Sequence, residues 1–185
     1  MKKIDMRFDV DCAKNMIGKE FVKYRCDRFD FTNSVTQIVG IYVGNKTYSL
    51  TNIQDTVDYY GTEDEISVYR FLETSTDTIR SAFADVEQVD TPVNSKIERI
   101  RFVNERQTIT EQGKITYDVQ LTRAVIFCFN DREISFEKDV VPFSEEIIIR
   151  RGYDLVDTVT GTDAFYEGWP SGAEPKCVRE VIEIS

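Results

Sequence analysis

Histidine is absent from the 185 residues of this chain. It is the usual general base near neutral pH and the commonest metal ligand, so its absence excludes Ser-His-Asp triads, Cys-His catalytic pairs and histidine-containing zinc sites. The glycine signatures Gly-x-Ser-x-Gly and Gly-x-Gly-x-x-Gly are also missing, which removes the common hydrolase and dinucleotide-binding motifs. The sequence therefore predicts no cofactor, no metal site and no catalytic residue that a motif identifies.

Cysteines are few, and long apolar runs are absent. The four cysteines are widely separated and form no Cys-x-x-Cys pair, which argues against a zinc ribbon; they are Cys12, Cys26, Cys128 and Cys177. No stretch approaches 18 apolar residues, and the first ten residues carry charges where a signal peptide needs an apolar core. These features predict a cytoplasmic protein with reduced cysteines and no membrane segment.

Basic residues are outnumbered by acidic ones, 23 against 33, which gives a formal net charge of −10. Residues 1–60 carry 9 basic and 8 acidic side chains, whereas residues 61–120 carry 7 and 12 and residues 121–185 carry 7 and 13. Such a charge disfavours direct binding to nucleic-acid phosphates or to an anionic membrane. It indicates either simple solubility or a surface suited to a basic partner.

Alternation of apolar and polar residues dominates the chain and predicts β-strands. Residues 4–10 and 115–121 show it most clearly. Residues 21–31 alternate too, but the phase changes near Asp27-Arg28, which predicts a bulge there. The same reasoning predicts strands over 36–43, 46–51, 66–72, 97–103, 106–111, 124–129, 132–138, 146–151 and 177–184.

Two runs, 38–43 and 124–129, are apolar at successive positions rather than at alternate ones, so both faces of each strand should be buried. We expect them to be central strands. Gly44-Asn45, Gln112-Gly113 and Asn130-Asp131 are typical of hairpin turns. Together these patterns predict a mainly β fold, a β-sandwich or barrel of about ten short antiparallel strands with one or two short helices.

Residues 11–17 and 76–84 are the two candidate helices, the second with Ile79 and Phe83 four apart on one face. The length fits one β-rich domain over residues 1–185. Residues 38–71 and 124–152 each have the pattern of a hairpin of two strands, followed by a third strand that begins with an acidic residue and continues with aliphatic ones. They are either an internal β-hairpin repeat or two ordinary hairpins, and the sequence leaves both interpretations open.

Basic residues gather around Phe102 and near residue 150 (Arg99, Arg101, Arg106, Arg150 and Arg151). Cations interleaved with aromatics are typical of single-strand nucleic-acid sites. Glu98, Glu105, Glu145 and Glu146 lie near them in the sequence, however, so the pattern favours cross-strand ion pairs.

The segment 153–170 is the most interface-like part of the sequence. It mixes large aromatic and acidic residues on a predicted loop, and we take seven of them as candidate binding residues: Tyr153, Asp154, Asp157, Asp163, Phe165, Tyr166 and Trp169. Aromatics on loops are common binding anchors. The alternative is that the only tryptophan plugs one end of the barrel or sandwich.

The sequence favours a non-catalytic binding protein whose partner is another protein, with a basic protein as one option and direct nucleic-acid binding disfavoured. One alternative is an acidic inhibitor that imitates the charge of nucleic acid and blocks a nucleic-acid enzyme. Another is a small-molecule-binding barrel or a carboxylate-dependent enzyme. Exposed sheet edges would allow a dimer, but no sequence feature indicates an oligomeric state.

Overall fold

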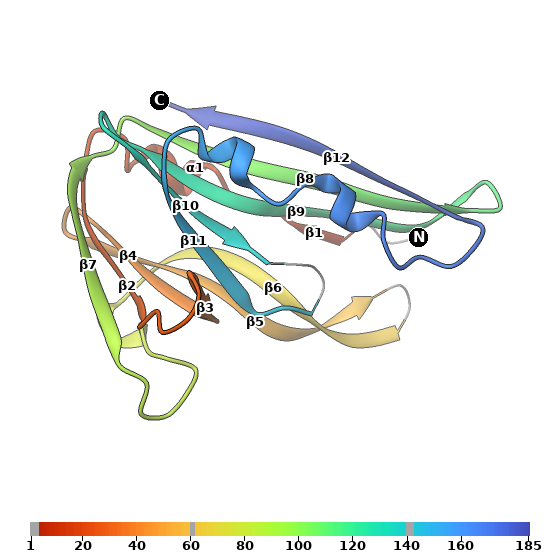
Figure 1. Ribbon diagram of the computed structural model, residues 1–185, viewed down its shortest axis with the longest axis horizontal. Coiled ribbons are helices and arrows are strands. Elements are labelled where there is room, and N and C mark those ends of the chain that lie inside the picture. The colour runs from red at the N-terminus through yellow and green to blue at the C-terminus, as the bar shows by residue number, and fades with distance from the viewer. Residues whose placement is uncertain (1–3, 60–61, 140–142) are drawn as a thin grey trace.

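A computed structural model describes residues 4–59, 62–139 and 143–185 and shows a mainly β protein in which two sheets pack face to face (Figure 1). The predicted fold class is confirmed, and the arrangement is a sandwich. All strand pairings are antiparallel except that of the first strand, which runs parallel to its neighbour in the larger sheet.

The larger sheet has seven strands in the order β12-β8-β9-β10-β11-β3, with β1 paired to β9 where β10 ends. Its strands are β1 (Ile4–Met6), β3 (Ser34–Thr36), β8 (Arg99–Glu111), β9 (Lys114–Cys128), β10 (Glu133–Lys138), β11 (Glu146–Gly152) and β12 (Ala173–Ile184). In Figure 1 the β8–β9 hairpin and β12 project together to the right.

The smaller sheet has five strands in the order β6-β5-β4-β2-β7. They are β2 (Glu20–Asp27), β4 (Ile38–Val43), β5 (Lys46–Tyr59), β6 (Thr62–Thr74) and β7 (Gln88–Lys96). Both predicted central strands have neighbours on each side, β4 between β2 and β5, and the buried half of β9 between β8 and β10.

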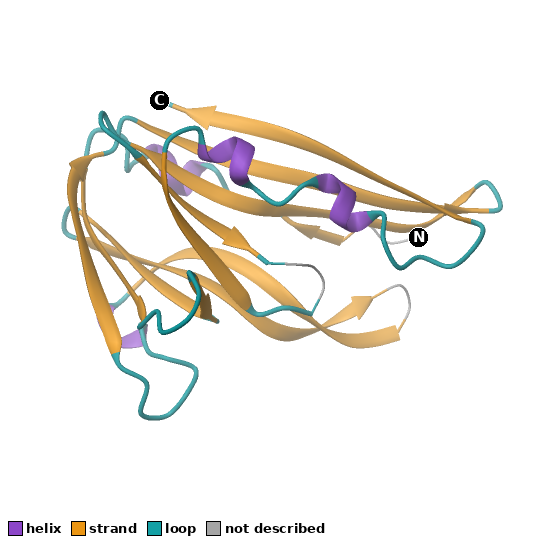
Figure 2. Ribbon diagram, in the orientation of Figure 1, coloured by secondary structure: helices purple, strands orange, loops and turns teal. Residues whose placement is uncertain are grey.

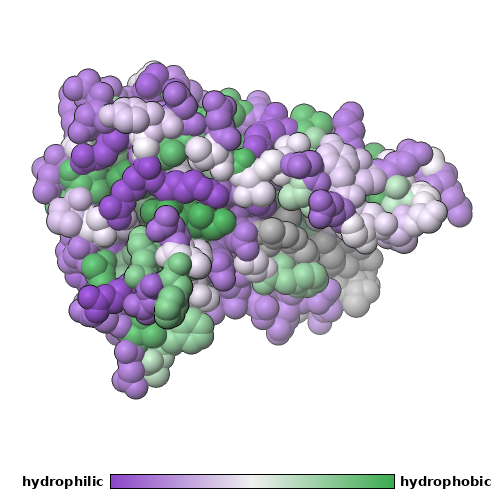
Figure 3. All heavy atoms as spheres, in the orientation of Figure 1, coloured by the Kyte–Doolittle hydropathy of each residue, from purple (hydrophilic) through white to green (hydrophobic). Residues whose placement is uncertain are grey.

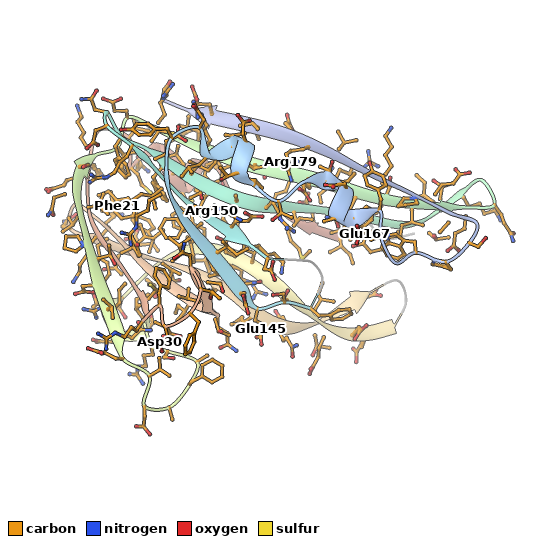
Figure 4. The ribbon with its side chains drawn as sticks, in the orientation of Figure 1. Phe21, Asp30, Glu145, Arg150, Glu167 and Arg179 are labelled. Atoms are coloured by element: carbon orange, nitrogen blue, oxygen red, sulfur yellow. The ribbon has the colours of Figure 1, made fainter. Side chains whose placement is uncertain are left out.

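Aromatic side chains from both sheets form the main core. Phe21 of β2 packs edge-on against Phe127 of β9, with ring centroids 5.0 Å apart, and Tyr24 meets Phe136 in the same geometry at 5.5 Å. All four side chains are fully buried. The position of Phe21 between the two layers is visible in Figure 4. Edge-to-face pairs add a modest specific attraction to the hydrophobic burial that joins the sheets.

Among the described residues, helical structure is limited to single turns. Helix α1 (Asp11–Lys14) is shorter than the predicted helix over 11–17, although Gly18 follows with the positive φ of +79° that a glycine allows. The predicted helix over 76–84 is wrong. Only the 3₁₀ turn η1 (Thr76–Thr78) forms, because Ile79 alone turns into the molecule while Phe83 stays in solvent.

Several predicted strands are fragments of longer ones. Residues 97–103 and 106–111 belong to β8, and 115–121 and 124–129 to β9, because register shifts at Val103/Asn104 and Ile109/Thr110 change the phase of the alternation without ending either strand. Strands β8 and β9 are therefore longer than expected, whereas β1 ends at Met6 and is shorter than the predicted strand over 4–10. Strands β3 and β7, by contrast, were not predicted at these positions.

The prediction for residues 21–31 is wrong in its second half. Strand β2 ends at Asp27, and its register shift lies between Phe21 and Lys23 rather than at Asp27-Arg28. The following loop leaves Phe31 99% exposed. The phase change read from the sequence therefore marks the exit of the chain from the sheet.

The three predicted hairpin turns are confirmed, since they connect β4 to β5, β8 to β9 and β9 to β10. The β4–β5 hairpin of residues 38–71 lies in the smaller sheet, and the β9–β10 hairpin of 124–152 lies in the larger one. A repeat remains one interpretation of these two units. No helix in the described ranges is both long and apolar enough to cross a membrane.

Cross-strand ion pairs explain the basic cluster for four of its five arginines. Arg99 and Arg101 contact Glu183, Arg106 contacts Asp118 at 2.9 Å, and Arg150 contacts Glu137. The fifth, Arg151, donates to the hydroxyl of Tyr24 instead.

Candidate functional site

The predicted interface segment lies across the outer face of the seven-stranded sheet. We call residues 153–172 the strap; it contains the 3₁₀ turns η2 (Leu155–Thr158) and η3 (Thr162–Phe165), drawn in purple along the upper strands in Figure 2. Leu155 and Val159 are buried against Val103 and Ile126. The strap thus closes a second, smaller core, which is why β9 is apolar on both faces.

Three of the four predicted aromatic residues pack against the projecting β8–β9 hairpin and β12. The rings of Phe165 and Trp169 each lie 5.8 Å from the ring of Tyr117, and the indole nitrogen of Trp169 donates to the carbonyl of Phe165 at 2.6 Å. The hydroxyl of Tyr166 accepts from the amide of Cys177 at 3.2 Å. Trp169 therefore covers one face of the larger sheet rather than plugging an end, yet it remains 38% exposed.

The polar members of the predicted site and Tyr153 point outward. Asp154, Asp157 and Asp163 are exposed, as is Glu167, which Figure 4 places on the same strap. Within the described part of the chain, none of these four carboxylates makes an ion pair at 4.0 Å or less. The structure thus brings the seven candidate residues onto one strap but leaves their binding role a prediction.

A buried layer of charge lies between the strap and the sheet. Glu137 is fully buried and accepts hydrogen bonds from Arg123, from Arg150 and from the amide of Thr160 on the strap. Figure 4 shows Arg150 on β11 close to the strap. This layer ties the strap to the sheet, and its residues come from four separate stretches of sequence.

A second charged contact holds the strap to strand β12. Arg179 pairs with the buried Glu105 at 2.5 Å and also donates to the carbonyls of Val159 and Thr160. Both carboxylates of the layer therefore have arginine partners, so we assign the layer a structural role.

Lys138 forms a polar centre between the two sheets. Its fully buried ammonium donates to Asn52 Oδ1 at 3.1 Å, to the hydroxyl of Ser67 and to the carbonyl of Ser144 at 3.2 Å. Burial is the largest influence on the amine, followed by repulsion from Arg123, and together they lower the pKa of Lys138 to about 7. Ser67 and Lys138 resemble a nucleophile and a base in their contact, but both are fully buried, so we assign them to intersheet packing.

A groove with a volume of about 400 Å³ opens where β1 of one sheet approaches β6 of the other. Residues 4–9, which comprise β1 and the three residues after it, line one side, and residues 68–72 of β6 line the other. Phe8 crosses its inner end, with its ring 4.8 Å from Tyr69 and 5.9 Å from Phe71. The floor is therefore aromatic.

The two strands that flank the groove each have a partner on one side only. Strand β6 pairs with β5 and β1 pairs with β9, and within the described residues no strand pairs with the opposite edge of either. Unpaired backbone amide and carbonyl groups along such edges can accept another strand. The rims carry Arg7, paired with Asp5 at 2.7 Å, and Arg70, paired with Asp55. Leu72 lies exposed at the end of the β6 side.

A small apolar patch occupies the loops beside β7. Phe31 lies on the loop after β2, and Phe83 and Val86 lie on the loop before β7; the bases of the two loops meet where the amide of Arg28 donates to the carbonyl of Glu87. In Figure 3 green groups gather on the lower left projection, while hydrophilic side chains dominate the rest of that face. A shallow hollow of about 280 Å³ lies beside Phe31, but its five lining residues, 29–33, all come from the one loop after β2. We use the patch below as a control surface.

The four cysteines are free thiols, and no cluster of three or more Cys, Asp or Glu side chains in the described ranges could hold a metal ion. A scan of protein-family models and searches of curated proteins and of solved structures found no match to this chain. The geometry of the molecule itself is therefore the basis for a proposed function.

Proposed function

We propose that this chain is a non-catalytic binding protein that takes up an extended segment of another protein as an added strand in the groove between β1 and β6. The observation that carries the proposal is the groove itself, with a free strand edge on each side and an aromatic floor. Strand addition supplies affinity through backbone hydrogen bonds, and pockets for alternate side chains supply specificity.

The condition of the edges at β3 and β7 supports the choice of β6. Proteins usually protect edge strands by keeping them short or by interrupting them with proline or bulges. Strand β3 has three residues, and β7 carries Pro92 and pairs with β2 across a register shift. Strand β6 has 13 residues and no proline, and its pairing with β5 runs without a register shift. Its edge is thus open where the groove needs it.

The lining indicates the chemistry of the ligand. Side chains of an added strand alternate between the two sides of the strand, so every second residue would face Phe8, Tyr69 and Phe71. The intervening residues would meet the charged rims beside Arg7 and Arg70. We therefore expect a peptide of about five residues with apolar side chains at alternate positions and polar ones between them.

Peptides selected on this protein from a random display library should show that alternation and should protect the amides of residues 68–72 from hydrogen exchange. The substitution Leu72→Asp should weaken their binding about tenfold or more, because it removes apolar contact at the groove rim. Peptides methylated at alternate backbone nitrogens should lose binding as well, since each methyl group removes a strand hydrogen bond.

Two matched controls sharpen the result. Ile53→Asp makes the same kind of change at an exposed position of β5 outside the groove, and Phe31→Ser alters the apolar loops; neither should affect peptide binding. Selected peptides that tolerate Leu72→Asp but are lost with Phe31→Ser would refute the groove and assign binding to the loops.

A basic partner for the strap is a second candidate function, favoured by four exposed carboxylates that make no ion pair with any residue the structure describes. In this proposal the strap imitates the phosphates of a nucleic acid and occupies the basic groove of a nucleic-acid enzyme. Changing Asp154, Asp157, Asp163 and Glu167 to the corresponding amides should then weaken binding to such enzymes at low salt by about tenfold or more. The amide variant of Asp77, Asp85, Glu87 and Glu111 has the same change of net charge and serves as control. Equal losses in both variants would contradict a specific role for the strap.

A further inference from the structure

The outer edge of β12 is the second long strand edge that the fold leaves open. The strand runs for 12 residues and pairs with β8 along its whole length. No strand in the described residues pairs with its other side, because β12 is the last strand of the larger sheet. Pro175 interrupts only its first part. The stretch from Cys177 to Ile184 contains no proline, and the charges along it are those of Arg179, Glu180 and Glu183.

This edge is held firmly in place and exposes apolar side chains. Arg179 and Cys177 fix the strand to the strap and to β8 through the contacts with Glu105 and Tyr166. Val178 and Val181 are nevertheless 51% and 42% exposed. A rigid edge loses little conformational entropy when another strand adds to it, which favours pairing.

Charge selects both the occupant and the register. In antiparallel pairing about a two-fold axis through Val178, two copies of β12 overlap from Ala173 to Glu183, which is nearly the whole strand. Lys176 of each copy then lies opposite Glu180 of the other. Neither residue makes an ion pair at 4.0 Å or less within the described part of its own chain, so both charges are available.

The neighbouring registers are unfavourable. Moving the axis to Cys177 places Glu174 opposite Glu180 of the second copy. With the axis at Arg179, the two Arg179 side chains face each other. With the axis at Glu180, the two Glu180 side chains do. Like charges directly opposite each other destabilise an antiparallel pair, whereas opposite charges stabilise it. The side-chain sequence of β12 thus favours self-pairing about Val178 over these neighbouring registers.

We propose that a second copy of this chain is the partner of β12, and that the two copies pair antiparallel about Val178 to join their seven-stranded sheets into one continuous sheet. This isologous interface uses the same surface on both copies, as two-fold dimers do. It lies on a different sheet edge from that of β6, so it is independent of the groove and of the proposed function.

Charge exchange gives the first test. Lys176→Glu and Glu180→Lys should each weaken the dimer at least tenfold, measured by sedimentation equilibrium, because two ion pairs become two like-charge pairs. An equimolar mixture of the two single variants should associate again, since position 176 of each variant then faces a charge of opposite sign at position 180 of the other. Lys114→Glu, at the exposed hairpin tip, is the matched control and should dimerise like the original chain.

A cysteine test fixes the register. Facing residues of antiparallel strands have Cα atoms about 4.5–5.5 Å apart, which a disulfide can span. Val178→Cys should therefore form a covalent dimer under mild oxidation. Val181→Cys, which is similarly exposed but would lie opposite Pro175, should not. The proposal would be overturned if the original chain were monomeric at every concentration. It would also be overturned if all charge variants left the dimer unchanged, or if Val181→Cys alone formed the covalent dimer.

Discussion

Glu137→Gln should lower the free energy of unfolding by about 3–5 kcal/mol in urea denaturation. Glu137 is fully buried, and its carboxylate is the acceptor for Arg123, for Arg150 and for a strap amide. Arg123 is itself buried, with 4% of its side chain exposed. The amide has nearly the same shape but no charge, so the variant would leave the Arg123 guanidinium in a dry site without its counter-charge.

The double variant separates charge from packing. Glu137→Leu with Arg123→Met removes both buried charges and should recover much of the loss, because replacing a buried ion pair by apolar groups is often neutral. Glu73→Gln breaks the exposed pair with Lys46, at 2.7 Å, and should cost less than about 1 kcal/mol. If Glu137→Gln also cost less than about 1 kcal/mol, the structural role assigned to the charged layer would be contradicted.

Stability should rise with pH from about 7 to about 9 and then fall. The pKa of Lys138 is lowered by burial to about 7, whereas the unfolded chain has the ordinary value of 10.5. Between these values the unfolded state binds more protons, so stability increases with pH. Burial raises the pKa of Cys26, Cys128 and Cys177 to about 12 from 9.0. Those thiols contribute stability below pH 9 that is lost as the pH rises toward 12.

Lys138→Met tests the rising limb. The difference in unfolding free energy between the original chain and this variant should change by roughly 2 kcal/mol from pH 7 to pH 9, in favour of the original chain at the higher pH. Lys114→Met, at an exposed lysine of the hairpin tip outside the proposed interface, is the control and should leave the pH profile unchanged. A profile that Lys138→Met does not alter would mean that the amine titrates normally in the folded protein.

Some features of the fold follow from local patterns. The two fully apolar runs are interior strands because a strand buried on both faces needs apolar residues at every position. The sequence predicted cross-strand ion pairs for Arg99, Arg101, Arg106 and Arg150, but their partners on neighbouring strands are Glu183, Asp118 and Glu137, which only the strand pairing identifies. The hairpin turns were predictable because Gly44 and Gly113 adopt positive φ, which glycine allows without strain.

Other features depend on contacts between distant segments. Strand β9 looks like two strands because its register shift against β8 changes the alternation, and only the pairing shows that the strand continues. The helix predicted over 76–84 failed because no surface receives Phe83. The strap was predicted as an interface from its aromatics, yet Phe165 and Trp169 pack on Tyr117, a contact that sequence spacing does not reveal.

The proposed groove and dimer edge show the same limit. Residues 4–9 and 68–72 lie far apart in the chain and have no motif in common; the groove exists because β1 occupies the position beside β9 that β10 leaves empty. Alternation and charge, which are local properties, determined by themselves that this is an acidic β protein and which runs lie inside it. Only the tertiary structure decided which strand edges stay open, because edges depend on strand order, and strand order is set by packing between segments distant in the sequence.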